Sequence, residues 1–389
     1  MSAPIAPVDE AGIIDAVQSA RAAREPLAIT GQGSKPGLLR PVQAARNLST
    51  RALSGVTLYR PAELIISARA GTALAEIEAA VAEKGQQLVA ESPYLNGIFG
   101  TSAPPSIGGV VAANLSGPRR VAWGATRDHV MGMRFINGAG EAIRSGGRVL
   151  KNVTGLDLCK LLSGSYGTLG VITEVTLKVL PAPETSATLF IETPDLTTAV
   201  AALSAGLGSP FGVSAAAALP RTNHVLAALR IEDFAASVTY RMAKLRDLLD
   251  SFGAQRMGDE GESRVFWRNV REVEPLQLRV DEALWRVSVR PSVGPGIAAI
   301  ARRIGGRSML DWGGGLVWIA ATPSPSNHHA ITEAARAEGG AAMLFRAPDA
   351  LRLSVPVLPG VNDALHRIEQ RMKDALDPFG LFNPGHLRA

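Results

Sequence analysis

The chain of 389 residues is long enough for two or three domains, and its 46% hydrophobic and 19% charged residues exclude a disordered protein. Its 40 basic and 35 acidic residues give a net charge of +5, and the basic residues are scattered, which disfavours a nucleic-acid-binding protein. The single cysteine, Cys159, excludes an internal disulfide and an iron–sulfur cluster held by this chain alone.

The first predicted elements lead into a glycine-rich loop. The apolar spacing in residues 9–24 predicts a short amphipathic helix, and residues 26–30 (PLAIT) predict a strand. The loop at residues 31–37 (GQGSKPG) follows, where two glycines allow successive N–H groups to point into one concavity suited to an anion. An ordinary turn after a strand is the alternative, and the glycine spacing is not the Rossmann fingerprint.

An α+β unit follows this loop. Residues 56–60 and 64–71 read as strands, residues 72–85 as a helix ending at Gly85, and residues 87–90 as another strand. A long loop then leads to residue 105.

Residues 105–180 are rich in glycines that lie next to the β-branched runs 110–111 and 171–173. Glycine is needed where the backbone takes positive φ or where another group approaches closely, so buried strands packed against a large flat ligand are expected. A loop-rich region with ordinary turns is the alternative. Residues 130–136 and 171–179 predict strands, and Asn137-Gly138 predicts a hairpin that returns through residues 141–144. Residues 152–162 have helical spacing, which makes Cys159 a small core residue.

Three blocks in this region, residues 105–114 (PSIGGVVAAN), 123–143 and 152–179, resemble the flavin-binding domain of the vanillyl-alcohol oxidase and p-cresol methylhydroxylase superfamily. The likeness is greatest to its D-2-hydroxy-acid dehydrogenase branch. The resemblance implies FAD as cofactor, with the loop at residues 31–37 around the pyrophosphate. Because this loop has no histidine or cysteine, non-covalent FAD is expected.

The resemblance also implies the positions that would bind FAD, and Asp128 is expected to order its loop through hydrogen bonds to backbone. Arg119, Arg120 and Trp123 would lie near the reactive edge of the flavin, where an arginine can bind a substrate carboxylate; a solvated basic turn is the alternative. The expected FAD-binding residues are Gly31, Gln32, Gly33, Ser34, Lys35, Pro36, Pro105, Ser106, Ile107, Gly108, Gly109, Ala112, Asn114, Gly124, Ala125, Asp128, Gly164, Gly167, Gly170, Val171, Ile172 and Asn383.

After residue 183 the pattern changes to alternating strands and helices, which predicts an antiparallel sheet with helices on one face. The predicted fold class is therefore α+β: an FAD-binding domain over 1–183, a smaller cap domain over 184–375, and a tail over 376–389 that returns to the FAD domain. The expected strands are residues 188–192, 213–219, 225–230, 285–289 and 351–355; the helices are 196–203, 235–252, 327–338 and 360–376; a hairpin lies near 311–321.

The sequence lacks residues that the resemblance would require for binding and oxidising a substrate. The histidine-bearing G-D-G-N-x-H signature of the catalytic members of the branch is absent, and the adjacent His328 and His329 make a poor ligand pair, better read as surface or helix-cap residues. No metal site and no catalytic base are predicted. These departures match the smaller FAD-binding subunits of the glycolate oxidase complexes in this branch.

The resemblance therefore implies a subunit that takes part in oxidising glycolate or a related 2-hydroxy acid. Its expected partners are a larger homologous flavin subunit and an iron–sulfur subunit, and the chain is expected to be inactive alone. A structural subunit without redox function and a free-standing FAD-dependent alcohol oxidase are the alternatives. With no signal-peptide pattern and no run near ~18 apolar residues, we expect a cytoplasmic protein that reaches the inner face of a membrane only through partners.

Overall fold

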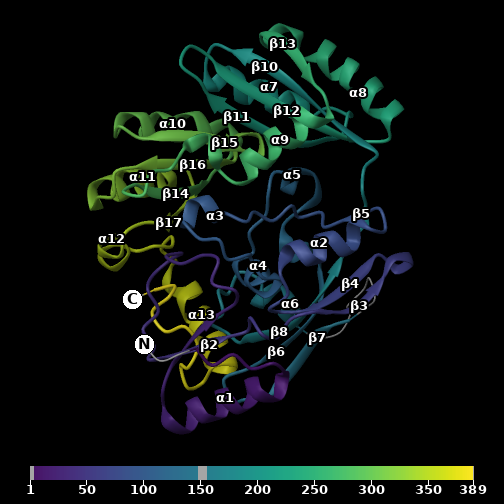
Figure 1. Cartoon of the computed structure of the whole chain (residues 1–389). Coiled ribbons are helices and arrows are strands. Elements are labelled where there is room, and N and C mark those ends of the chain that lie inside the picture. Colours follow the sequence, from purple (N-terminus) through teal and green to yellow (C-terminus); the bar gives the residue numbers. More distant parts are fainter. Residues whose placement is uncertain (1–3, 148–155, 389) are drawn as a thin grey trace.

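The computed structural model describes residues 4–147 and 156–388, and two antiparallel sheets dominate it. A five-stranded sheet lies in the N-terminal half and an eight-stranded sheet in the C-terminal half, with short helices between them (Figure 1). This arrangement confirms the predicted α+β fold class. The first four residues of the predicted helix at 152–162 lie outside the described residues.

The N-terminal half contains the sheet with strand order β3-β4-β8-β6-β7 and two small two-stranded sheets, β1-β2 and β5-β9. Its helices are α1 (Glu10–Ala23), α2 (Leu74–Ala82), α3 (Asn96–Phe99), α4 (Ile107–Ala113), α5 (Arg120–Trp123) and α6 (Leu158–Leu162). Its strands are β1 (Leu27–Thr30), β2 (Arg46–Ser49), β3 (Val56–Arg60), β4 (Ile65–Arg69), β5 (Gln86–Gln87), β6 (Val130–Ile136), β7 (Ala142–Gly146), β8 (Val171–Lys178) and β9 (Leu180–Pro181).

The C-terminal half is organised on the sheet with strand order β13-β10-β12-β11-β15-β16-β14-β17. Its strands are β10 (Thr185–Thr193), β11 (Val213–Pro220), β12 (Val225–Asp233), β13 (Ala254–Gly258), β14 (Ala283–Ser288), β15 (Arg307–Asp311), β16 (Leu316–Ala321) and β17 (Ala341–Arg346). Its helices are α7 (Leu196–Leu207), α8 (Ala235–Leu248), α9 (Glu260–Arg271), α10 (Gly294–Arg303), α11 (Pro325–Ala337), α12 (Asp349–Ser354) and α13 (Asp363–Leu376).

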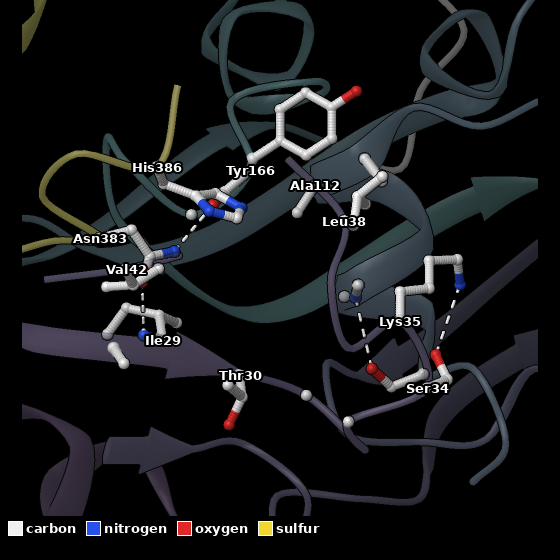
Figure 2. A pocket seen from close by; sticks show the side chains of 18 of the residues that line it. Ile29, Thr30, Ser34, Lys35, Leu38, Val42, Ala112, Tyr166, Asn383 and His386 are labelled. Carbon is white, nitrogen blue, oxygen red and sulfur yellow. Dashed lines mark hydrogen bonds between the residues drawn. The ribbon is translucent and has the colours of Figure 1, made fainter. Parts of the chain in front are cut away.

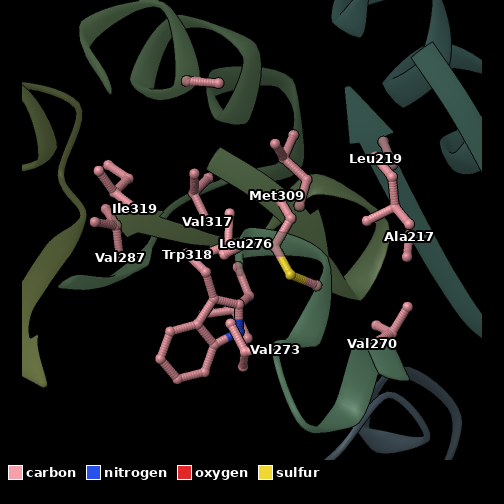
Figure 3. Packing of buried hydrophobic residues seen from close by; sticks show 14 of the residues in the cluster. Ala217, Leu219, Val270, Val273, Leu276, Val287, Met309, Val317, Trp318 and Ile319 are labelled. Carbon is pink, nitrogen blue, oxygen red and sulfur yellow. The ribbon is translucent and has the colours of Figure 1, made fainter. Parts of the chain in front are cut away.

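Helices cover both faces of this sheet, so the expectation of helices on one face is wrong. Val317 and Ile319 of β16 point toward α10, whereas Trp318 points to the other face, against Val273 in the turn after α9 (Figure 3). Helix α9 therefore lies between the sheet and the N-terminal half (Figure 1). The face of the sheet that carries Trp318 looks toward the predicted FAD-binding residues.

Two predicted strands are helices. The Val110–Val111 run lies in α4, because Ser106 caps this helix by accepting a hydrogen bond from the N–H of Gly109. Residues 351–355 fall largely in α12, which begins directly after Pro348, and the last strand of the sheet is β17. Helix α9 had no sequence prediction although Asp259 caps it, and the strand expected at 87–90 is reduced to β5.

The chain returns to the N-terminal half before it ends. Leu381 and Phe382 are buried with α1 and β1, and the N–H of Asn383 donates to the carbonyl of Leu27 (3.0 Å). The carboxylate of Asp377 accepts hydrogen bonds from the N–H groups of Leu381 and Phe382, both at 2.9 Å. Among the described residues, no helix is long and apolar enough to cross a membrane.

Candidate cofactor site

A cavity of about 400 Å³ lies where the loop after β1, helix α4, the turn before β8 and the C-terminal tail meet (Figure 2). Three cationic side chains line it, those of Lys35, Arg40 and Arg352, and no Asp or Glu is among the described lining residues. A cavity with this charge suits an anionic ligand.

The loop at residues 31–37 forms one wall. The backbone N–H groups of residues 32–35 have no hydrogen-bond acceptor within the described part of the chain. Gly33 has φ = +77°, a left-handed conformation that glycine adopts without steric cost. Consecutive free N–H groups in such a turn form a concavity that accepts phosphate oxygens. The predicted anion-binding loop therefore has the donors that a diphosphate needs.

Lys35 adds positive charge to the same wall. Its ammonium group lies 3.4 Å from the hydroxyl of Ser34 (Figure 2). Burial lowers the pKa of Lys35 to about 8, which Glu272 opposes only in part. A bound diphosphate would restore the charged form by supplying the counter-charge that the cavity lacks.

Two glycines leave room where main chain approaches the cavity wall. A Cβ on Gly31 would lie 2.2 Å from the hydroxyl of Ser106, and one on Gly108 would lie 2.7 Å from the Cβ of Ala70. The N–H of Gly108 donates to the carbonyl of Ala70, and that of Ile107 to the carbonyl of Thr72. These two N–H groups are therefore not free to bind a ligand, because they attach the start of α4 to the turn between β4 and α2.

The turn before β8 and the tail form the opposite wall. Gly164 and Gly167 have positive φ, and Gly170 packs against Phe135, so the turn depends on glycine as predicted. The side-chain amide of Asn383 accepts from the N–H of Ile29 (2.6 Å) and donates to the carbonyl of Tyr166 (2.8 Å; Figure 2). Asn383 thus ties the strand before the anion loop to this turn.

The cavity brings together fourteen of the predicted positions and leaves eight outside. Those that line it are Gly31, Gln32, Gly33, Ser34, Lys35, Pro36, Ser106, Gly108, Gly109, Ala112, Gly167, Gly170, Ile172 and Asn383. Those that do not are Pro105, Ile107, Asn114, Gly124, Ala125, Asp128, Gly164 and Val171.

The eight outer positions support the wall or the core. Asp128 accepts a hydrogen bond from the N–H of Ala125 (2.8 Å), which confirms its predicted role in ordering the loop. Asn114 accepts from the N–H of Arg127 (3.0 Å). Val171 is fully buried in the cluster under α1, so it packs in the core while its neighbour Ile172 reaches the cavity.

The sequence reasoning missed several lining residues, and four of them carry an ionisable side chain. They are Arg40, Tyr166, Arg352 and His386. Arg40 and Arg352 are buried, each donates to backbone carbonyls, and the Nε of each has no partner within the described structure. These residues come from segments far apart in the sequence, and no local pattern marked them.

Arg119 does not face the cavity. Its guanidinium forms a two-point ion pair with Glu232 of β12 (2.7 and 3.0 Å) and is mostly buried, so neither the substrate-binding nor the solvated reading of Arg119 is right. Trp123 is half exposed and does not line the cavity. The neighbouring Arg120 instead packs over the ring of Trp312, in the C-terminal half.

The remaining candidates are structural. Cys159 is buried, which confirms the core assignment, and burial raises the pKa of its thiol. His328 is a buried partner of the Trp285 indole N–H (3.2 Å), so its reading as a surface or cap residue is wrong, whereas His329 is exposed. Within residues 4–147 and 156–388, no group of three or more His, Cys, Asp or Glu side chains is placed to hold a metal ion.

Comparison with known proteins supports FAD as the cofactor. Residues 1–146 match a family model described as an FAD binding domain. Glycolate oxidase subunit GlcE of Escherichia coli is 37% identical over 379 residues, which is 97% of each chain. Glycolate oxidase subunit GlcD of Bacillus subtilis is 45% identical over 85 residues, 22% of this chain and 18% of that protein. The prediction of FAD as cofactor is confirmed.

The fold is also found in solved structures. p-Cresol methylhydroxylase with bound substrate superposes with a TM-score of 0.74 at 14% identity, covering 99% of this chain and 88% of that one. At this identity the likeness concerns the fold alone, and it confirms the predicted fold.

Proposed function

Because the chain belongs to the family of glycolate oxidase subunit GlcE, we propose that it is the FAD-binding subunit of a multi-subunit oxidase acting on glycolate or a related 2-hydroxy acid. The observation that carries the proposal is a cavity that is lined by many glycines and by no described Asp or Glu. It lies in a chain that aligns with that subunit over 97% of its length. The product would be the corresponding 2-oxo acid.

The residues of the cavity fit the cofactor. The free N–H groups of residues 32–35 and the Lys35 ammonium would hold the diphosphate, and the small residues Gly109, Ala112 and Gly170 would let a planar ring lie against the main chain. Bound FAD supplies the acceptor for the hydride that leaves C2 of the substrate. Among the described lining residues there is no cysteine, and the anion loop itself contains neither histidine nor cysteine, so non-covalent binding is part of the proposal.

Electrons would leave this chain through partner subunits. The single cysteine cannot hold an iron–sulfur cluster, so the proposed partners are a larger homologous flavin subunit and an iron–sulfur subunit. A cytoplasmic location, with any membrane association made through those partners, belongs to the same proposal. The hydroxyl proton of the substrate requires a base, and we assign none in this chain.

The test is an anaerobic titration of the purified chain with glycolate, followed by the flavin absorbance, with and without co-expressed partners. We expect stoichiometric FAD in the isolated chain, negligible turnover alone, and bleaching of the flavin in the assembly. Gly33→Glu places a negative charge beside the diphosphate and should abolish FAD retention, whereas Gly97→Ala, which does not line the cavity and has open space for a Cβ, should not.

Two alternatives give different results in the same titration. A structural subunit would hold FAD that glycolate never bleaches, in keeping with the absence of an assigned base. A free-standing alcohol oxidase would turn over alone, with a kcat in the typical enzyme range of roughly 1–10³ s⁻¹. That last result would contradict the proposed dependence on partners.

A further inference from the structure

Two arginines meet at one tryptophan between the two halves of the molecule. The Cζ of Arg120, from α5, lies 4.6 Å from the ring centroid of Trp312, and the Cζ of Arg286, from β14, lies 5.0 Å from the same ring. This geometry places the two charges within roughly 10 Å of each other, about one Debye length. The junction therefore concentrates positive charge at a defined point.

Neither charge is neutralised by the protein. Among the described residues, Arg120 and Arg286 form no ion pair, and their guanidinium groups make no hydrogen bond that satisfies them. By contrast, neighbouring Arg119 and Arg230 are both paired with buried carboxylates. Arginines at a domain junction normally find such partners, because burying an unpaired charge is costly.

The acidic group that acts on Arg286 offers little compensation. Burial raises the pKa of Asp311 to about 7, so its carboxyl group is partly protonated at neutral pH. The carboxyl group of Asp311 accepts a hydrogen bond from the N–H of Trp312 (2.7 Å) and none from an arginine. Burial also lowers the pKa of the Arg286 guanidinium, and Arg120 lowers it further. Asp128 acts on Arg120 from a distance, but no described carboxylate forms an ion pair with either arginine.

The pair lies on the cofactor side of the junction. Arg286 pairs with Trp318 across β14 and β16, so it is on the sheet face that looks toward the N-terminal half. Tyr166, which lines the cofactor cavity, lies near Arg286. Burial raises the pKa of the Tyr166 hydroxyl, and the positive charge of Arg286 opposes this rise. The indole N–H of Trp312 donates to the carbonyl of Gly117 (3.1 Å), which fixes the ring between the halves.

We propose that Arg120 and Arg286, which both pack on Trp312, form a binding site for the carboxylate of a small substrate beside the cofactor cavity. This inference rests on the proposed function and identifies residues for it. A carboxylate accepts two parallel N–H donors from one guanidinium and offers a full counter-charge to the other, which a neutral alcohol does not. The site needs both halves of the chain, since α5 and β14 are 160 residues apart.

The experiment measures anion binding without turnover. Oxalate is a two-carbon carboxylate with no C–H bond to oxidise, and glycolamide is the uncharged amide of glycolate. Their dissociation constants with the FAD-loaded chain are measured by calorimetry and by quenching of tryptophan fluorescence. We expect oxalate to bind and glycolamide to bind much more weakly.

The variants separate charge from folding. Arg286→Gln and Arg120→Gln should each weaken oxalate binding by roughly 10- to 100-fold, because one removes a charge-assisted pair of hydrogen bonds and the other removes the second counter-charge. Arg286→Lys keeps the charge and should retain part of the affinity. The control Arg290→Gln, at an exposed pair with Glu338, should bind as the wild type does. An unchanged FAD spectrum in every variant reports an intact fold.

Several results would overturn the site. Failure of the wild type to bind oxalate at about 10 mM, equal affinity for glycolamide, or unchanged binding in both glutamine variants would each do so. These outcomes leave FAD binding untouched. The proposed function instead fails if the purified chain takes up no FAD, and in that case oxalate binding to the apoprotein still tests the arginine pair.

Discussion

Glu232 lies in a network of buried charges that joins the two halves of the molecule, and its removal should destabilise the protein. Its carboxylate pairs with Arg119 (2.7 Å) of the N-terminal half and with Arg230 (3.2 Å) on its own strand. Arg230 in turn pairs with Glu91 (3.0 Å), again across the junction. The substitution Glu232→Gln keeps the shape of the side chain and removes its charge from both arginines.

The magnitude follows from the pKa of Glu232. Burial alone would raise this pKa, but Arg230 and Arg119 outweigh burial and lower it from 4.5 to about 2. At about 1.4 kcal/mol per pKa unit, the charged form contributes roughly 3 kcal/mol. Removing one partner of a buried ion pair typically costs about 3–5 kcal/mol, which agrees.

The pH dependence has a definite sign. Because the pKa is lower in the folded state, this contribution is fully present above the unfolded value near 4.5 and is lost as the pH falls toward about 2. The difference in free energy of unfolding between wild type and Glu232→Gln should therefore be about 3 kcal/mol at pH 7 and about 2 kcal/mol at pH 3.5.

Urea unfolding followed by far-UV circular dichroism at both pH values measures this difference. Glu333→Gln is the matched control, because Glu333 forms an exposed pair with Arg336 (42% and 76% side-chain exposure). Exposed pairs contribute about 0–1 kcal/mol. If Glu232→Gln is no less stable than the control at pH 7, the network does not stabilise the junction and the reasoning is refuted.

Three further predictions follow from buried contacts. Wild type should lose stability relative to Asp311→Asn as the pH rises from 4 to 8, because the pKa of Asp311 is raised from 3.8 to about 7 in the folded state. The free energies of unfolding should shift relative to each other by up to roughly 4 kcal/mol. A difference in thermal unfolding that does not depend on pH would contradict this prediction. Asp377→Ala leaves two buried N–H groups of the tail without an acceptor and should cost about 2–4 kcal/mol, with faster proteolysis of the tail than in wild type. Gly108→Ala forces a Cβ within 2.7 Å of Ala70 and should cost about 1–3 kcal/mol in chemical unfolding, whereas Gly97→Ala, with open space, should not destabilise.

Local patterns predicted the elements that depend on neighbours in the chain. The hairpin around Asn137 has its strands at Val130–Ile136 and Ala142–Gly146, because the turn residues and the apolar run lie side by side in the sequence. The anion loop at residues 31–37 was predicted for the same reason, since its glycines and Lys35 are consecutive. The resemblance to the flavoprotein superfamily then implied the cofactor.

The sequence misled where local preference met a stronger tertiary constraint. The β-branched pair in α4 reads as a strand, yet the Ser106 cap and the close approach of Gly108 to Ala70 favour a helix there. The local sequence suggests that Arg119 is a free basic residue, but it forms an ion pair with Glu232, which lies more than a hundred residues later in the chain.

What the sequence by itself determined is the fold class, the anion loop at residues 31–37 and the helices and strands with clear periodicity. Only the tertiary structure decided which charges are paired and which are left open. Arg119 and Arg120 are adjacent in the chain, yet one is neutralised by β12 and the other meets Arg286 at Trp312. The reason is physical, because ion pairing and burial depend on which groups the packing of the two sheets brings together. The distances between such groups cannot be inferred from the order of residues along the chain.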